Sequence, residues 1–452
     1  MDDQRHGQPD RDPRRRRRRG PPCAPRGNTS TFVAPDSQPT GSTTSDTKTP
    51  AARTRDVLVI GGGPAGASTA AWAARFGLDV LLVERAHFPR EKACAEYLSP
   101  EAARDLDALG ILGEVEAEAM KLDGMRIVAD DGTDVLGRFR ATGRFTPYRP
   151  QGLALPRSRL DTIVLGSAAK AGAEVLQGVA CERLLVEDGF VAGAVLRSGD
   201  RRWAQRSRAV VGADGVHSVV ARRLGLSRHG SPRRLALVAH LAEAQGMRDC
   251  GEMFVRRGRY VGLAPIGSGL VNVAAVVPAT EGRAIARDPA GFLGAELRAH
   301  SELRTRLAGA RIVREVLVAG PFARTSRRSV TDGALLVGDA ADFFDPFTGE
   351  GIFAALRGGR LAGEALASAL SAGEATRAAL RPYRRERRRA FLGKWVFERL
   401  VGLAATRPAL MRRYVRHMGR HQRYADLWVG AAGDYVPVGA LCAPRALAAL
   451  IL

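Results

Sequence analysis

The chain has 452 residues, of which 45% are hydrophobic, so it can bury a sizeable core and is long enough for more than one domain. No run approaches the roughly 20 apolar residues that span a bilayer, and the five cysteines are scattered, without a C-x-x-C pair. These features exclude a membrane-spanning protein, a zinc site and a disulfide scaffold, and they favour a reduced, cytoplasmic protein.

The formal net charge of +22 comes mostly from two segments. Residues 1–55 contain twelve Lys and Arg against six Asp, and residues 381–423 contain fourteen Lys and Arg against two Glu. Such a basic balance raises nucleic-acid binding as one hypothesis. No recognition motif or aromatic platform accompanies the charge, so we expect no nucleic-acid partner.

Residues 1–52 are polar, contain Pro, Ser, Thr and Gly throughout, and lack an apolar period. A segment of this kind buries too little apolar surface to offset the entropy of ordering, so we expect a disordered basic tail. No apolar h-region follows the run Arg14–Arg19, so the sequence predicts neither a secretory nor a twin-arginine signal. A nucleic-acid-binding arm and a start placed too far upstream are the alternatives.

The segment from Asp56 to Gly66 reads DVLVIGGGPAG and is the most informative stretch of the chain. Gly61, Gly63 and Gly66 follow a short β-branched run and open an Ala-rich helical segment. This is a G-x-G-x-x-G dinucleotide fingerprint in its strand–turn–helix context. The motif therefore predicts a nucleotide-binding βαβ unit.

Each glycine of this motif has its own expected role. Gly61 permits the tight turn, Gly63 lets the backbone approach a pyrophosphate, and Gly66 lets helix and strand pack closely. Pro64 and Ala65 begin the helix, whose free N–H groups and dipole favour the anion.

An acidic residue follows at the expected distance. Glu84 closes the next strand, Val80–Val83, and Arg85 comes directly after it. A carboxylate at this position can accept hydrogen bonds from a ribose hydroxyl. We therefore include Glu84 and Arg85 in the predicted nucleotide site.

Beyond this unit, apolar periodicity predicts strands and helices in alternation. Residues 231–325 contain alternating apolar runs broken by Gly and Pro, typical of an antiparallel sheet. Everything after Arg381 is expected to be helical. The other expected elements are a strand entering a helix over Leu153–Gly172, strands at Ala173–Leu176, Phe190–Leu196, Ala209–Gly212 and Ala334–Gly338, and a helix over Gly351–Leu370.

Two further glycine–acid motifs each follow a short apolar strand. One is Asp214-Gly215 and the other is Gly338-Asp339. An Asp at such a position can accept from ribityl or ribose hydroxyls, although alone it is more typical of a turn or a helix cap. Three glycine–acid motifs in order favour the cofactor role.

The last of these motifs continues into a glycine-rich turn. The sequence Pro346-Phe-Thr-Gly349-Glu-Gly351-Ile352 leads directly into the expected helix. The N–H groups of that helix can face the pyrimidine end of a flavin, where negative charge accumulates on reduction.

With these motifs in order, residues 55–375 resemble the flavoprotein monooxygenase superfamily, and within it the geranylgeranyl-reductase-like branch. The resemblance implies an α/β fold in which an FAD-binding Rossmann-like domain of the glutathione-reductase type carries an inserted antiparallel-sheet substrate domain and a C-terminal helical region. The implied boundaries are 53–90, 150–228 and 326–376 for the FAD domain, 91–149 and 229–325 for the substrate domain, and 377–452 for the helical region.

The resemblance also implies the roles of individual residues. Arg157 matches an arginine that approaches the FAD diphosphate and ribose, Asp214-Gly215 matches a motif linked to FAD and NAD(P)H, and Asp339 matches the acid on the ribityl and pyrophosphate segment. Only one full fingerprint is present, so NAD(P)H is expected as a transient co-substrate without a domain of its own. No metal site is predicted.

Two segments depart from the pattern of prenyl reductases. Cys94-Ala-Glu96-Tyr97-Leu-Ser-Pro100 resembles a loop beside the isoalloxazine, but bulkier residues replace the branch's small glycines. The stretch Tyr260–Pro265 corresponds to a lipid-channel motif and lacks its tryptophan. We therefore expect a monooxygenase that hydroxylates an aromatic, quinone or polyketide-type substrate, with saturation of isoprenoid double bonds as the alternative. A flavin halogenase is disfavoured because its W-x-W-x-I-P motif is absent.

Glu96 and Tyr97 are the candidate catalytic residues, as acid–base or substrate-orienting groups. The alternative is that they form a surface turn. Cys94 either contacts the flavin or is a small buried hydrophobe, and His240 either faces the substrate cavity or is an ordinary core or surface histidine.

The C-terminal segment combines arginine clusters with apolar residues such as Trp395, Leu400 and Trp428. Such helices either form a basic amphipathic surface that holds the protein at an anionic membrane or pack as a solvated pair on the main body. We expect the substrate to be a small molecule of aromatic or lipid-like character.

Overall fold

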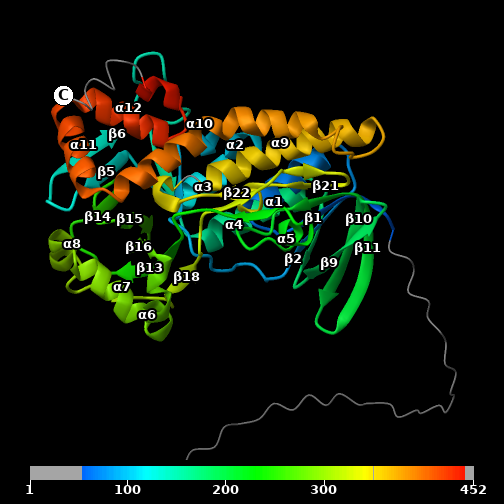
Figure 1. Ribbon diagram of the computed structural model, residues 1–452, viewed down its shortest axis with the longest axis horizontal. Coiled ribbons are helices and arrows are strands. Elements are labelled where there is room, and N and C mark those ends of the chain that lie inside the picture. Colours follow the sequence, from blue (N-terminus) through cyan, green and yellow to red (C-terminus); the bar gives the residue numbers. More distant parts are fainter. Residues whose placement is uncertain (1–52, 350, 443–452) are drawn as a thin grey trace, which may run out of the picture. The chain divides into compact units, whose positions relative to one another are not determined.

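The structure is a computed structural model that describes residues 53–349 and 351–442. The expected disordered tail lies outside the described residues. Within them, the chain forms the mixed α/β fold that the sequence predicts, with two eight-stranded and two three-stranded sheets (Figure 1).

The first large sheet contains the strand that precedes the glycine fingerprint. Its parallel strands are buried runs of Val, Leu and Ala, as expected for a sheet covered on both faces. An antiparallel pair of strands extends it beside β11. In spatial order the main path is β20 (Val330–Thr331), β21 (Ala334–Leu336), β11 (Arg201–Gly212), β1 (Arg55–Ile60), β2 (Val80–Glu84) and β8 (Glu174–Gln177), and the extension is β10 (Phe190–Ser198) and β9 (Ala180–Glu187).

Helices from distant parts of the chain pack with this sheet into one core. The expected strand-to-helix segment after residue 150 forms β7 and α4, and the expected helix at residue 351 forms α9. The helices of this part are α1 (Pro64–Arg75), α2 (Ala102–Ala108), α3 (Leu112–Glu118), α4 (Arg157–Lys170), α5 (Val219–Arg223) and α9 (Gly351–Ser371).

A line of glycines brings α9 against α1. A Cβ atom added to Gly359 would lie 2.6 Å from Ser68 Cβ, and one added to Gly363 would lie 2.5 Å from Trp72 Cβ. Real Cβ atoms do not approach so closely, so any larger residue would separate the helices. The glycine line therefore sets the position of the N-terminus of α9 relative to the fingerprint.

The second large sheet contains the antiparallel strands expected in residues 231–325, joined by a hairpin from earlier in the chain. The sequence analysis did not predict this hairpin or the three short helices that cover one face of the sheet. The strands, in spatial order, are β17 (Arg311–Ile312), β13 (Arg234–Ala242), β16 (Leu270–Pro278), β15 (Arg259–Gly267), β14 (Gly251–Arg256), β5 (Gly124–Val128) and β6 (Asp134–Arg138), with β18 (Leu317–Ala319) beside β13; the helices are α6 (Gly282–Arg287), α7 (Pro289–Arg298) and α8 (Ser301–Arg306).

Two small sheets complete the described strands. Both consist of short segments that are far apart in the sequence. One contains β3 (Tyr97–Leu98), β7 (Gly152–Ala154) and β4 (Met120–Leu122), and the other contains β12 (Ser227–His229), β19 (Arg324–Ser326) and β22 (Asp342–Phe343).

The segment expected to be helical after Arg381 forms α10 (Arg381–Ala405), α11 (Pro408–Arg420) and α12 (Gln422–Ala432). Their buried residues join a core with the second large sheet, where the rings of Phe397 and Trp428 lie 5.3 Å apart. Among the described helices, none is long and apolar enough to cross a membrane.

Candidate cofactor and substrate site

The three glycine–acid motifs meet at one edge of the first sheet. Ile60 of β1 lies opposite Gly212 of β11, and Gly212 lies opposite Leu336 of β21. Because these strands are parallel, the motifs that follow them emerge on the same side, where α/β sheets bind ligands.

Glycine contacts show how closely the motifs approach. A Cβ atom on Gly61 would lie 2.5 Å from the carbonyl oxygen of Ala213, beside the second motif, and one on Gly338 would lie 2.8 Å from Ala65 Cβ in the first motif. Gly61 also has a φ of +105°, which favours glycine.

The other two fingerprint glycines face different surroundings. A Cβ atom on Gly66 would lie 1.8 Å from the carbonyl oxygen of Gly61, so this glycine serves the close packing of strand and helix. At Gly63 the nearest atom is Arg90 Nη2, at 3.6 Å. Gly63 is the N-cap of α1, and no side chain caps its N–H groups. The N-terminus of a twelve-residue helix therefore borders open space, and this geometry fits a pyrophosphate.

Glu84 is buried at the end of β2 and points back to the glycine turn. One carboxylate oxygen accepts from the N–H of Gly62 at 2.8 Å and the other accepts from the N–H of Ala86 at 2.9 Å. Each oxygen keeps a lone pair for a further donor. The neighbouring side chain of Arg85 is exposed.

A group of cations lies beside this turn, and the sequence analysis missed two of them. The pKa of the Lys92 amine is lowered, first by desolvation and then by repulsion from Arg157, Arg90 and Arg85. The carboxylate of Asp339 opposes this shift. Gathered positive charge fits an anionic diphosphate. The signal was the basic segment Pro-Arg-Glu-Lys at residues 89–92, in the loop that follows β2.

Arg157 is buried at the start of α4. It forms a bidentate ion pair with Asp161, with distances of 2.7 and 2.8 Å. Desolvation lowers the pKa of this guanidinium, but Asp161 and Cys94 outweigh it and raise the pKa above its usual value. Arg90 also contacts Asp161, at 3.2 Å. Asp161 thus holds two cations near the fingerprint.

Asp214 serves as a helix cap, and it keeps one free oxygen. Its Oδ2 accepts from the N–H of Val219 at 2.6 Å. Its Oδ1 is buried and has no hydrogen-bond partner among the described residues. Burial raises the pKa of this carboxyl, although the hydrogen bond from Ser218 and those from the N-terminus of α5 oppose the shift. Gly215 follows with a φ of +79°.

Asp339 lies in a 3-10 turn, Gly338–Ala340, close to the start of α9. A Cβ atom on Gly351 would be 3.9 Å from its Oδ1. The pKa of the Asp339 carboxyl is raised by burial, and the nearby cations Lys92 and Arg157 only partly oppose this shift. In the sequence between Asp339 and Gly351, Pro346–Thr348 forms a 3-10 turn that ends at Gly349 with a φ of +71°.

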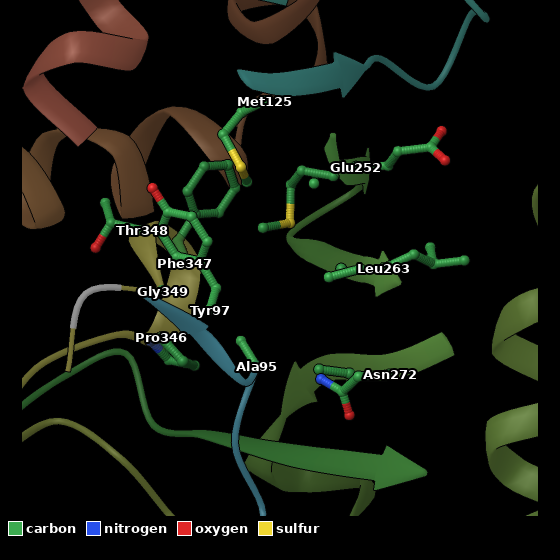
Figure 2. A pocket seen from close by; sticks show the side chains of 15 residues that line it. Ala95, Tyr97, Met125, Glu252, Leu263, Asn272, Pro346, Phe347, Thr348 and Gly349 are labelled. Carbon is green, nitrogen blue, oxygen red and sulfur yellow. The ribbon is translucent and has the colours of Figure 1, made fainter. Parts of the chain in front are cut away.

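A small cavity of about 40 Å³ lies between this turn and the second large sheet (Figure 2). The stretch Tyr260–Pro265, which lacks the tryptophan expected of a lipid-channel motif, forms one wall through Gly262, Leu263 and Ala264. The other lining residues are Ala95, Tyr97, Met125, Gly251, Glu252, Met253, Asn272, Ala274, Pro346, Phe347, Thr348 and Gly349.

Polar groups in this cavity are few. Glu252 contributes to the wall, but its carboxylate turns away and pairs with Arg126 and Arg306. Asn272 donates to the carbonyl of Cys94 at 3.0 Å. Asn272 Oδ1 and Thr348 Oγ1 are buried without a hydrogen-bond partner among the described residues. The cavity is therefore an apolar space with isolated acceptors.

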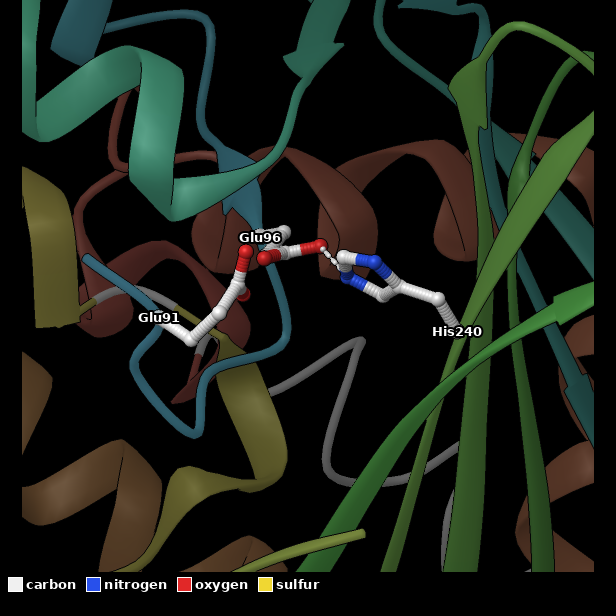
Figure 3. Close-up of side chains that lie close together, drawn as sticks. All are labelled: Glu91, Glu96 and His240. Atoms are coloured by element: carbon white, nitrogen blue, oxygen red, sulfur yellow. Dashed lines mark hydrogen bonds and ion pairs between the residues drawn. The ribbon is translucent and has the colours of Figure 1, made fainter. Parts of the chain in front are cut away.

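Glu96 and Tyr97 are both buried, so the surface-turn alternative is wrong. Tyr97 lines the cavity, whereas Glu96, the preceding residue in the chain, turns the other way with a φ of +57°. Its carboxylate accepts from the N–H of Arg157 at 2.9 Å and lies 2.7 Å from His240 Nε2 (Figure 3). Glu96 thus positions α4 and His240 rather than forming the cavity wall.

The carboxylate of Glu91 joins this pair, and ligand atoms of Glu91, Glu96 and His240 lie within 4.8 Å of one another. The sequence analysis did not foresee this cluster. Its members already have protein partners, because His240 bonds Glu96 and Glu91 pairs with Arg314 at 3.6 Å.

Glu398 of α10 is a buried acid behind the Pro346–Thr348 turn. Burial raises its pKa to about 7; Lys394 opposes this shift, and Asp434 and Asp345 add to it. The folded protein therefore holds an extra proton between pH 4.5, the unperturbed pKa of a Glu side chain, and about 7.

We expect the free energy of unfolding to fall as pH rises through this interval. The Glu398→Gln variant should lose that dependence and gain up to about 3 kcal/mol above pH 7, since one pKa unit is worth about 1.4 kcal/mol. Urea denaturation between pH 5 and 8 measures it. Glu386→Gln, on the solvent side of α10, is the matched control and should follow the parent chain. A parallel pH dependence in Glu398→Gln would contradict the prediction.

Comparisons with known proteins agree with this geometry. The model of the FAD binding domain family matches residues 54–393. The digeranylgeranylglycerophospholipid reductase of Methanosarcina acetivorans is 33% identical over 329 residues, which cover 71% of this chain and 76% of that protein. The menaquinone reductase of Mycolicibacterium smegmatis is 32% identical over 333 residues, which cover 69% of this chain and 76% of that protein.

Among solved structures, the flavin-dependent brominase Bmp2 has a TM-score of 0.75 at 20% sequence identity, covering 88% of this chain and 98% of that one. At that identity the likeness shows the fold alone.

Proposed function

This chain belongs to the FAD-binding domain family and is an FAD-dependent oxidoreductase, and from that premise we propose that it saturates carbon–carbon double bonds of an isoprenoid chain on a lipid or quinone. The sequence analysis gave this reaction as its alternative and oxygen insertion as its first expectation. Two observations now favour double-bond saturation over oxygen insertion.

The cavity beside the Pro346–Thr348 turn carries the proposal. Met125, Met253 and Leu263 make it apolar. Apolar lining with few polar groups is typical of a site for a hydrocarbon ligand. The bulky Glu96, which the sequence analysis took as a polar wall, does not face this space.

The names of the relatives support the same reaction. The relatives from Methanosarcina acetivorans and Mycolicibacterium smegmatis are named as reductases of a digeranylgeranyl lipid and of menaquinone. Both substrates carry isoprenoid chains, so we assign that substrate class to this chain.

We propose the FAD contacts from the site geometry. The N-terminus of α1 at Gly63 holds the diphosphate, with Arg90 and Lys92 supplying charge, and Glu84 accepts from the adenosine ribose. Asp339 accepts from the ribityl segment. FAD, when bound and reduced by NAD(P)H, would supply hydride to one carbon of the double bond, and a proton from solvent would complete the saturation at the other.

The chain's own residues orient the substrate and exclude water. Tyr97 and Phe347 lie next to each other on one side of the cavity in Figure 2, where they would confine the alkene. The Glu96–His240 hydrogen bond holds the loop that carries Tyr97, which makes Glu96 a positioning residue.

The experiment is turnover without oxygen. We expect the FAD-loaded protein, reduced by NAD(P)H under nitrogen, to add two hydrogens per saturated bond to a geranylgeranyl lipid or to menaquinone. Mass spectrometry of the product measures this, and FAD-free protein is the control. Oxygen-dependent hydroxylation of a phenol, with no saturation under nitrogen, would contradict the proposal and restore the monooxygenase prediction.

A further inference from the structure

Helix α10 presents a row of apolar side chains to solvent. Leu392, Val396, Leu400 and Leu403 are 45%, 44%, 54% and 51% exposed. Their spacing of three and four residues places them on one face of the helix, and we call them the apolar stripe. Single exposed hydrophobic residues are common, but contiguous ones mark a contact surface.

Arginines surround the apolar stripe. Arg385, Arg388 and Arg389 are exposed on the turns of α10 that precede it, and Arg399 and Arg407 flank its C-terminal half. Acidic charge does not compensate within residues 381–423. Glu386 pairs with Arg389 at 3.1 Å, and Glu398 is buried. An apolar face bordered by cations is typical of a helix that lies in the interface of an anionic bilayer.

The opposite side of α10 reaches the substrate cavity. Arg234 forms an ion pair with Asp345 at 2.8 Å and donates to the carbonyl of Gly402 in α10 at 3.3 Å. Asp345 caps the turn that begins at Pro346, which lines the cavity. Helix α10, which carries the apolar stripe, is thus linked to the turn beside the cavity through Arg234 and Asp345.

We propose that the apolar stripe and its flanking arginines dock this enzyme on the surface of an anionic lipid bilayer. The leucine and valine side chains enter the interface, and the guanidinium groups contact lipid phosphates. This inference goes beyond the proposed reaction, because it concerns where the enzyme binds rather than what it reduces. A second copy of the chain and the apolar C-terminal residues 443–452 are the competing occupants.

The test is flotation of the full-length, FAD-loaded protein with vesicles. We expect binding to vesicles of phosphatidylglycerol and phosphatidylcholine, and much weaker binding to phosphatidylcholine alone or at high salt. Leu400→Ser with Leu403→Ser should weaken binding on the order of tenfold or more, given about 0.8 kcal/mol per buried methylene. The matched control is Val186→Ser with Val318→Ser, since these valines are 54% and 46% exposed on other elements and should not matter.

Further variants test the contribution of the arginines and the two competing occupants of the apolar stripe. Arg385→Gln with Arg388→Gln should weaken binding only to the anionic vesicles. Equal binding by the leucine variant and the parent would overturn the proposal. So would concentration-dependent dimerisation through the stripe without vesicle binding, or vesicle binding that deletion of residues 443–452 abolishes while the leucine variant retains it. None of these readouts depends on turnover, so failure of the reductase proposal would leave this test intact.

Discussion

The Gly63→Val variant is expected to fold normally and to lose its FAD. A Cβ atom added at this position would lie no closer than 3.6 Å to another atom, Arg90 Nη2, so we expect the variant to keep the packing of the chain. The added side chain projects into the open space at the N-terminus of α1, where the diphosphate is proposed to bind. We expect the dissociation constant for FAD to rise on the order of 100-fold or more, which corresponds to about 2.7 kcal/mol.

Flavin absorbance after purification and fluorescence titration of the apoprotein measure this effect. Gly66→Ala is the informative comparison, because its added Cβ would lie 1.8 Å from the carbonyl oxygen of Gly61. That variant should lose at least about 3 kcal/mol of stability. Unchanged FAD affinity in folded Gly63→Val protein would remove this turn from the cofactor site.

The Asp161→Ala variant should lose about 3–5 kcal/mol of stability. Removing this carboxylate leaves the guanidinium of Arg157 buried without its bidentate partner, and an unpaired buried charge is far more costly than a missing surface pair. Arg90 would lose the same partner. Urea denaturation monitored by circular dichroism gives the change in the free energy of unfolding.

The same helix offers a matched control. Arg159 pairs with Glu118 through two contacts of 2.7 Å, but both side chains are substantially exposed. Glu118→Ala should therefore cost less than about 1 kcal/mol, since solvent screens such a pair. Equal losses in the two variants would show that burial does not set the strength of the Arg157–Asp161 pair.

Local patterns were sufficient to predict much of the fold. The β-branched run before Gly61 and the Ala-rich segment after it define β1 and α1, and alternating runs predict the strands of the second sheet. The parallel pairing of β5 with β14 was not predictable, because it depends on contacts between segments that are far apart. Helices α6–α8 were missed since each is short, with ten residues or fewer.

In the candidate site, too, some features could be predicted from local sequence patterns and others could not. Glycine spacing and acids at strand ends identified Gly63, Glu84 and Asp339 without a structure. The direction of the Glu96 side chain depends on a φ of +57°, which residue type alone does not indicate. Lys92 was missed because its importance depends on Arg157 and Asp339, which lie on two other segments far away in the sequence.

The meeting of three motifs at one sheet edge has a consequence for when the cofactor can bind during folding. Gly61, Asp214 and Asp339 become neighbours only after β21, late in the chain, has paired with β11. A partly synthesised chain or an intermediate that lacks this pairing has an incomplete site. FAD then stabilises only the fully assembled state, and by mass action its concentration shifts the equilibrium toward that state alone. Flavin retention is thus a report on completed folding as well as on catalytic competence.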